Sequence, residues 1–213
     1  MNRMKEVDKI KIEIKRLESY FDKFELFEPS STTSIEHFKT YYTGLTPDIK
    51  DFYTFCNGFD VHTDDYYDGK VISLEEHLEL IEAIRSDNLP LFTYQFPILT
   101  DGCGNYDCVM FLNGQGSNSV VFRDSDDGLP SYVKANCLSS YFSFLTNDLL
   151  LRYNRDGTIK PEYDLENPDP VEIDWPHNSR QMITKDPGLI DLYKDVGYAL
   201  QFSSPEDLIK SLD

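Results

Sequence analysis

The first apolar pattern along the chain predicts a helix near the N-terminus. Apolar residues recur at alternating spacings of three and four from Val7 to Phe24, which places them on one face of a helix. The same spacing fits the a and d positions of a coiled coil, so a dimer through this helix is an alternative. The run is shorter than the roughly three to four heptads that a coiled coil needs. We therefore expect the helix to pack on its own domain.

A second helix has start and stop signals in the sequence. Thr46 suits the N-cap position, and Pro47 suits the first helical position, where a missing N–H costs nothing. Apolar side chains with helical spacing follow over 49–56. The pair Asn57-Gly58 then predicts a left-handed end to this helix.

The rest of the pattern predicts an antiparallel sheet with helices around it. Turns of four or five residues separate the later strands, and such short connections join only antiparallel neighbours. Pro97 predicts an edge or interrupted strand, and the capping box Ser73-Leu74-Glu75-Glu76 predicts a helix start. The fold class is therefore α+β, a mostly antiparallel meander sheet flanked by helices, with a C-terminal helical extension. The other expected elements are a connector at 30–34, strands at 71–72, 94–100, 106–112, 119–123 and 132–134, and a helix over 138–149.

Charge limits the partners of the chain. Its 213 residues include 20 Lys and Arg and 38 Asp and Glu, which gives a formal net charge of −18. Nucleic-acid binding and docking on anionic membranes depend on clustered Lys and Arg, so neither is expected. Residues 1–24 hold seven basic and five acidic side chains, a net +2, so the remainder carries −20. Hydrophobic residues make up 40%, enough to build a core.

The cysteines predict a reducing compartment. Cys56, Cys103, Cys108 and Cys137 form no Cys-x-x-Cys pair and are too few for a disulfide framework, so we expect free thiols. No secretory h-region follows Met1, and no window reaches the roughly 18 apolar residues of a membrane span. The expected protein is soluble and cytoplasmic.

Three motifs occur in the order that is characteristic of a known family. They are LTPDIKDFYTFCNGF at 45–59, FPILTDGCGNYD at 96–107, and VVFRD at 120–124 followed by LSSYFSFL at 138–145. Together they resemble the SUKH superfamily, which contains immunity proteins of bacterial polymorphic toxin systems and fungal regulators of cell-wall glucan synthesis. Thr46 stands where the family usually has Pro, a mild departure because Pro47 serves the turn.

The resemblance implies a SUKH-like domain over residues 1–154. Residues 155–213 lie outside it and are too few for a separate core, so we expect them to dock on the same core. The implied function is that of an immunity protein, which binds a cognate toxin, such as a nuclease, and neutralises it by stoichiometric contact. The alternative is a non-catalytic regulator or scaffold in cell-wall or envelope synthesis. We expect a monomer or weak dimer with no cofactor and no metal.

Motifs for catalysis or metal binding are weak. The Gly102–Gly104 turn lacks a third glycine and precedes a strand, which favours a tight hairpin over a phosphate site. The Asp-rich loops before Gly69 and Gly128 lack ligands that an EF-hand needs. The four histidines lie in separate segments, and no Gly-x-Ser-x-Gly motif occurs. We do not expect the protein to be an enzyme, because an enzyme would require a pocket with converging titratable groups.

Acidic clusters are the remaining candidates for a binding site. A nuclease toxin must carry a basic groove for phosphates, which an acidic inhibitor can occupy. Tyr and Trp among the acids suit interface anchors. The simpler interpretation of each cluster is a solvated face that aids solubility. A further acidic stretch, 162–174, contains no Lys or Arg. The residues expected to contact a basic toxin are Asp64, Asp65, Tyr66, Tyr67, Asp68, Asp124, Asp126, Asp127 and Trp175.

Overall fold

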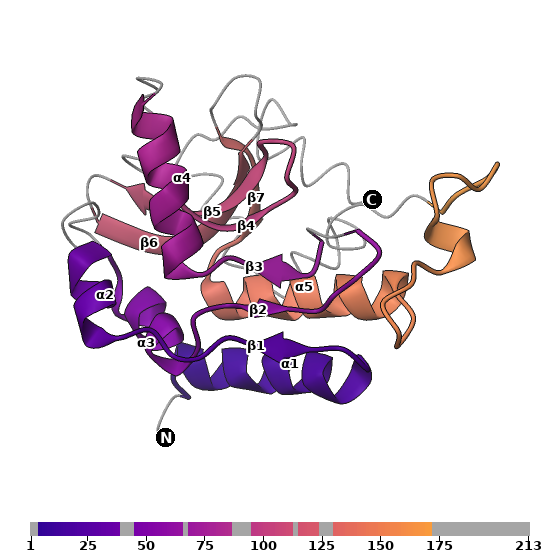
Figure 1. Ribbon diagram of the computed structural model, residues 1–213, viewed down its shortest axis with the longest axis horizontal. Helices are drawn as coiled ribbons and strands as arrows, with labels where there is room; N and C mark the ends of the chain where they lie inside the picture. The colour runs from indigo at the N-terminus through magenta and orange to yellow at the C-terminus, as the bar shows by residue number, and fades with distance from the viewer. Residues whose placement is uncertain are drawn as a thin grey trace, which may run out of the picture.

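The computed structural model describes residues 4–38, 45–65, 68–86, 95–112, 115–123 and 130–171. Within these residues the chain forms five α-helices, one short 3-10 helix and a seven-stranded sheet (Figure 1). The helices are α1 (Glu6–Tyr20), α2 (Thr32–Phe38), α3 (Pro47–Phe55), α4 (Leu74–Ser86), α5 (Leu138–Arg152) and the 3-10 helix η1 (Pro161–Tyr163). The strands are β1 (Glu25–Leu26), β2 (Phe59–Asp60), β3 (Lys70–Val71), β4 (Gln95–Thr100), β5 (Tyr106–Leu112), β6 (Gln115–Arg123) and β7 (Pro130–Ala135).

The sheet is the antiparallel meander that the sequence predicts. Its strands lie in chain order from β1 to β7, and each pairs antiparallel with its neighbour. The α+β fold class is therefore confirmed.

Helix α1 packs within the domain, against α5. The two helices lie side by side in the lower half of Figure 1. Ile14 and Leu17 are buried in the core, so the predicted apolar face is covered by the same chain. The helix ends at Tyr20, before the apolar pattern does. Phe24 lies beyond the helix and packs against Phe59 of β2, with ring centroids 5.6 Å apart.

Helix α3 begins as predicted but ends differently. Thr46 Oγ1 accepts a hydrogen bond from Ile49 N at 3.4 Å. At the other end Cys56, directly after the helix, is extended, with φ −150°. Gly58, two residues further on, has a positive φ of 100°. A Cβ at Gly58 would lie 2.3 Å from the carbonyl oxygen of Val71. This glycine therefore permits close approach to β3 and does not form the left-handed helix end that we predicted.

The connector predicted at 30–34 is wrong in its second half, where α2 begins. Ser34 N donates to Ser31 Oγ at 3.0 Å, a local side-chain cap. Ile35 and Phe38, three residues apart, are buried. The combination of a serine cap and this apolar pair is the signal that the composition of the segment concealed.

The capping box before α4 is confirmed. Ser73 N donates to Glu76 Oε2 at 2.9 Å, and Glu76 N donates to Ser73 Oγ at 3.1 Å. Each residue thus satisfies a backbone donor of the other at the helix start. Burial alone would raise the pKa of Glu76, but the Lys70 ammonium and Ser73 hold that pKa below its ordinary value.

Strand β4 is interrupted and is not an edge strand. It pairs with β3 on one side and β5 on the other. The register with β5 shifts between Pro97 and Leu99, which accommodates a proline that has no N–H to donate. Of the two alternatives that the proline left open, the interrupted strand is therefore the one observed.

The chain after α5 folds back onto that helix. Tyr153 and Ile159 form an antiparallel bridge. Lys160 Nζ donates to the carbonyl oxygens of Leu150 and Leu151 at 3.0 and 2.6 Å, which satisfies acceptors at the end of α5. The start of the predicted extension, residues 155–160, therefore contacts the main domain. Residues 172–213, including the helices predicted there, lie outside the described residues.

Two expectations about thiols and membrane spans can be compared with the structure. All four cysteines are free, as predicted. Burial raises the pKa of the Cys56 thiol to about 12, so this thiol stays protonated and packs as a small apolar group. Among the described residues, no helix is long and apolar enough to cross a bilayer.

Candidate partner-binding surface

The predicted site residues that the structure describes lie in the loop between β2 and β3, and this loop is fastened to the turn after α5. Asp64 N donates to Gly157 O at 2.9 Å, and Ile159 N donates to Asp64 Oδ2 at 3.2 Å. Gly157 has φ 88°, and a Cβ there would lie 2.3 Å from His62 O. The glycine lets the two segments pack backbone against backbone.

Asp68 fixes the other end of this loop. Its Oδ2 lies 2.6 Å from Arg152 Nη1, and it accepts a hydrogen bond from the Tyr153 hydroxyl. Arg152 also donates to Asp148 Oδ2 from Nε at 3.0 Å and from Nη2 at 2.7 Å. One guanidinium therefore bridges two carboxylates, one in the loop and one on α5.

Burial governs the electrostatics of this cluster. Asp148 is 6% exposed, and burial raises its pKa, while the Arg152 guanidinium partly offsets that rise. Burial and the Asp68 carboxylate raise the pKa of Tyr153, which keeps its hydroxyl a donor. The cluster is thus an internal anchor of the loop. Asp68 was predicted to contact a partner, and the structure shows it with partners inside the chain.

A second buried ion pair lies under α5. Asp107 on β5, 3% exposed, lies 2.8 Å from Lys134 Nζ of β7 and accepts a hydrogen bond from Tyr141 at 2.7 Å. Burial and Asp107 raise the pKa of the Tyr141 hydroxyl. Sequence reasoning missed this pair. Its signal was a charged residue in each of two predicted strands, but only the register shows that they meet.

The outer side of the anchored loop is acidic. Asp64 and Asp65 are exposed, and so are acidic residues on the two segments beside the loop. His62, with φ 52°, lies between Glu25 and Asp60, with nitrogen–oxygen distances of 3.5 and 3.7 Å. We call the following five residues the acidic surface: Asp22, Glu25, Asp64, Asp65 and Asp156.

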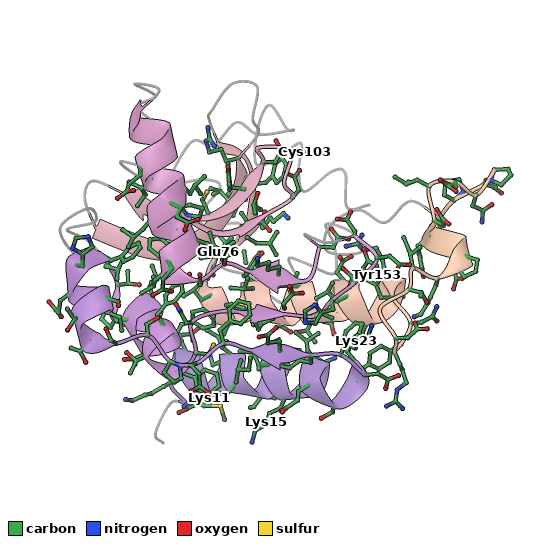
Figure 2. The ribbon with its side chains drawn as sticks, viewed as in Figure 1. Lys11, Lys15, Lys23, Glu76, Cys103 and Tyr153 are labelled. Atoms are coloured by element: carbon green, nitrogen blue, oxygen red, sulfur yellow. The ribbon has the colours of Figure 1, made fainter. Side chains whose placement is uncertain are left out.

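Two cations border the acidic surface. Arg155 Nη2 lies 3.2 Å from Asp22 Oδ1, and both side chains are more than half exposed. The Thr158 hydroxyl and backbone N–H, and more weakly Lys23, hold the pKa of Asp156 below its ordinary value. Figure 2 shows Lys23 near the end of α1. The surface therefore contains five carboxylates, with Arg155 beside Asp22 and Lys23 close enough to Asp156 to affect its pKa.

The other basic residues of the first helix face elsewhere. Lys11 and Lys15 lie along the lower side of α1 in Figure 2, away from Tyr153 and the anchored loop. Lys11 and Lys15 are therefore not among the cations that border the acidic surface.

Six of the predicted contact residues cannot be placed. They lie outside the described residues: Tyr66, Tyr67, Asp124, Asp126, Asp127 and Trp175. Of the remaining three, Asp64 and Asp65 belong to the acidic surface and Asp68 to the anchor. Glu25 and Asp156 join Asp64 and Asp65 only through tertiary contacts, so no sequence cluster indicated them.

The glycine-rich turn between β4 and β5 is the predicted tight hairpin. Gly102 and Gly104 have φ of 72° and 95°. Asp101 Oδ1 accepts hydrogen bonds from the backbone N–H of Cys103 at 2.8 Å and of Asn105 at 3.1 Å. These donors are thus used within the turn, and a phosphate would have to compete with Asp101 for them.

The structure also bears on metal binding and pockets. In the part of the chain that the structure describes, no three His, Cys, Asp or Glu side chains are arranged to hold a metal ion. A groove of about 340 Å³ lies between α1 and α5, on the N-terminal half of each helix. Its charged residues are Lys9, which pairs with Glu6 at 2.6 Å, and Glu13, which pairs with Arg16 at 2.5 Å. Local ion pairs therefore occupy the charged groups of this groove.

No protein-family model matches the chain, and no curated protein matches it. The resemblance to the SUKH superfamily therefore rests on the three motifs in the sequence and stays a prediction.

Proposed function

We propose that the protein is a SUKH-like immunity protein that binds a cognate toxin and neutralises it by stoichiometric contact. The observation that supports this proposal best is the acidic surface, two of whose residues, Asp64 and Asp65, lie on a loop anchored at both ends. The motif resemblance supplies the class of partner, and the charge supplies its chemistry. The toxin would present a basic surface, such as the phosphate-binding groove of a nuclease.

The anchoring of the loop suits this function. Asp64 and Asp68 hold the loop through Ile159 and Arg152, so little conformational entropy is lost when a partner binds. Carboxylates on such a surface attract a basic partner before contact, and complementary charge raises association rates to roughly 10⁸–10⁹ M⁻¹ s⁻¹ at low salt. Fast association benefits an inhibitor that must act before its toxin does.

The first experiment asks whether a toxin partner exists. The gene beside this one is inspected for a large toxin, and an inactive form of its product is mixed with the full chain. We expect a one-to-one complex whose association rate falls steeply as the salt concentration rises from about 50 to about 500 mM. A neighbouring toxin that forms no complex would refute the proposal.

The second experiment asks whether the acidic surface makes the contact. We expect the double variant Asp65→Asn/Asp156→Asn to bind the toxin about 10-fold more slowly at low salt, with a weaker salt dependence. The matched control is Asp8→Asn/Glu18→Gln, which removes two exposed acids from α1. Equal association rates for both double variants would show that the acidic surface is not the contact.

A further inference from the structure

The loop Pro161–Val171 exposes apolar side chains to solvent. Leu165 is 86% exposed and Val171 is 51% exposed. Five large hydrophobic residues are exposed in the described part of the chain, and this short loop supplies two of them, including the most exposed. A single exposed apolar side chain is ordinary and does not by itself mark a binding site.

Internal hydrogen bonds close this loop on itself. Val171 N donates to Glu162 O at 2.7 Å, which joins its two ends. Asn167 spans the middle: its N donates to Asp164 O at 2.9 Å, and its Nδ2 donates to Pro161 O at 2.9 Å. Compact surface loops with joined ends are frequently functional. These hydrogen bonds hold the backbone on both sides of Leu165.

The loop is fixed at its base and projects from the molecule. Lys160, directly before it, donates to the end of α5, and Tyr163 N donates to Lys160 O at 2.9 Å. Figure 1 shows η1 and the residues after it extending away from the sheet and from α1. A loop that projects in this way can enter a concave surface on a partner.

Charge identifies the kind of concave surface. The loop carries four carboxylates and no Lys or Arg, and the prolines at 161, 168 and 170 restrict its backbone. The four carboxylates belong to Glu162, Asp164, Glu166 and Asp169. An apolar side chain with carboxylates before and after it in the same loop is complementary to an apolar pocket bordered by Lys and Arg.

We propose that Pro161–Val171 is a docking loop, in which Leu165 enters an apolar pocket of the toxin and the surrounding carboxylates meet basic residues at the pocket rim. This inference rests on the proposed function, because it gives the same toxin a second point of contact. It differs from the acidic surface in relying on an apolar anchor, so the two contacts are separable by salt and by substitution.

The test uses the full chain and the inactive product of the neighbouring toxin gene. Affinity and dissociation rate are measured for wild type, Leu165→Ala, Leu165→Asp and the control Ile12→Asp, which alters an apolar residue 50% exposed on α1. We expect about 10-fold weaker binding for Leu165→Ala, about 100-fold weaker binding for Leu165→Asp, and a change below about 2-fold for Ile12→Asp. The loss is expected in the dissociation rate.

The outcomes separate the two proposals. If wild type binds the toxin and Leu165→Asp binds equally well, the docking loop is refuted and the proposed function stands. If wild type forms no complex, the proposed function fails, and the docking loop fails with it. Because Leu165 is exposed, thermal unfolding of its variants is expected to match wild type, which excludes misfolding as the cause of weaker binding.

Discussion

Arg152 at the end of α5 and Asp68 in the β2–β3 loop form an ion pair, with Nη1 2.6 Å from Oδ2. The same guanidinium holds the buried Asp148. Although burial alone would lower it, these two carboxylates raise the pKa of Arg152, so the cation is present at any physiological pH. The pair connects residues far apart in the sequence and fixes the loop that carries Asp64 and Asp65.

The variant Arg152→Gln is expected to lower the free energy of unfolding by about 3 kcal/mol, because it leaves the Asp148 carboxylate buried without its cation. Urea denaturation measures the change. Arg155→Gln is the control, since Arg155 is 67% exposed and pairs only at the surface, where a pair contributes about 0.5 kcal/mol. Equal losses for the two variants would contradict the anchoring role of Arg152.

Replacing Gly157 by alanine is expected to loosen the acidic surface. The new Cβ would meet His62 O at 2.3 Å in a backbone conformation, φ 88°, that alanine adopts poorly. We expect a loss of about 2 kcal/mol or more and faster hydrogen exchange at the amide of Asp64, which donates to Gly157 O. Gly102→Ala, at an exposed turn with φ 72°, serves as the reference. Unchanged exchange at Asp64 would count against the contact.

The buried pair of Asp107 and Lys134 gives a test by double substitution. Lys134→Met is expected to cost about 3 kcal/mol, because it leaves the Asp107 carboxyl group buried, at 3% exposure, without the cation that pairs with it. Asp107→Leu/Lys134→Met removes both charges. Made in a Tyr141→Phe background, so that no buried hydroxyl loses its acceptor, it is expected to cost less than Lys134→Met in the same background. Denaturant unfolding of these proteins measures both values. If the double variant has a lower free energy of unfolding than the single one, the ion pair itself stabilises the fold, beyond each charge offsetting the burial of the other.

His77 makes stability depend on pH. It is fully buried against Phe96, with ring centroids 4.1 Å apart, and burial lowers its pKa from 6.5 to about 3. Between those values the unfolded chain binds a proton that the folded chain does not. Stability therefore falls as pH drops below 6.5, by up to about 1.4 kcal/mol for each pH unit.

The measurement is the free energy of unfolding from pH 6.5 to 5, above the range where most carboxylates titrate. His77→Gln is expected to flatten the dependence by about one proton. His37→Gln, at an exposed histidine, is expected to leave the slope unchanged. A slope that persists in His77→Gln would assign the effect to another group.

Local structure followed from the sequence wherever neighbouring residues carry the interaction. The capping box of Ser73 and Glu76 and the N-cap of Thr46 depend on atoms within one helical turn, so their pattern was sufficient. The helix α2 was missed because its composition resembles a loop, and its short apolar face is stabilised by burial. The predicted end of α3 was wrong because Gly58 is required for close packing against β3, a strand that does not neighbour the helix in the sequence.

The sequence by itself determined the fold class, the antiparallel connections and the concentration of the net negative charge after residue 24. Apolar periodicity, turn length and charge counts are local properties, and they need no knowledge of contacts. Only the tertiary structure decided which acids are anchors and which are exposed. Asp68 and Asp65 are near neighbours in one acidic run, yet Asp68 faces Arg152 and Asp65 faces solvent. That difference comes from the last residue of α5 and the turn that follows the helix, which place a cation and a stretch of backbone against one side of the loop.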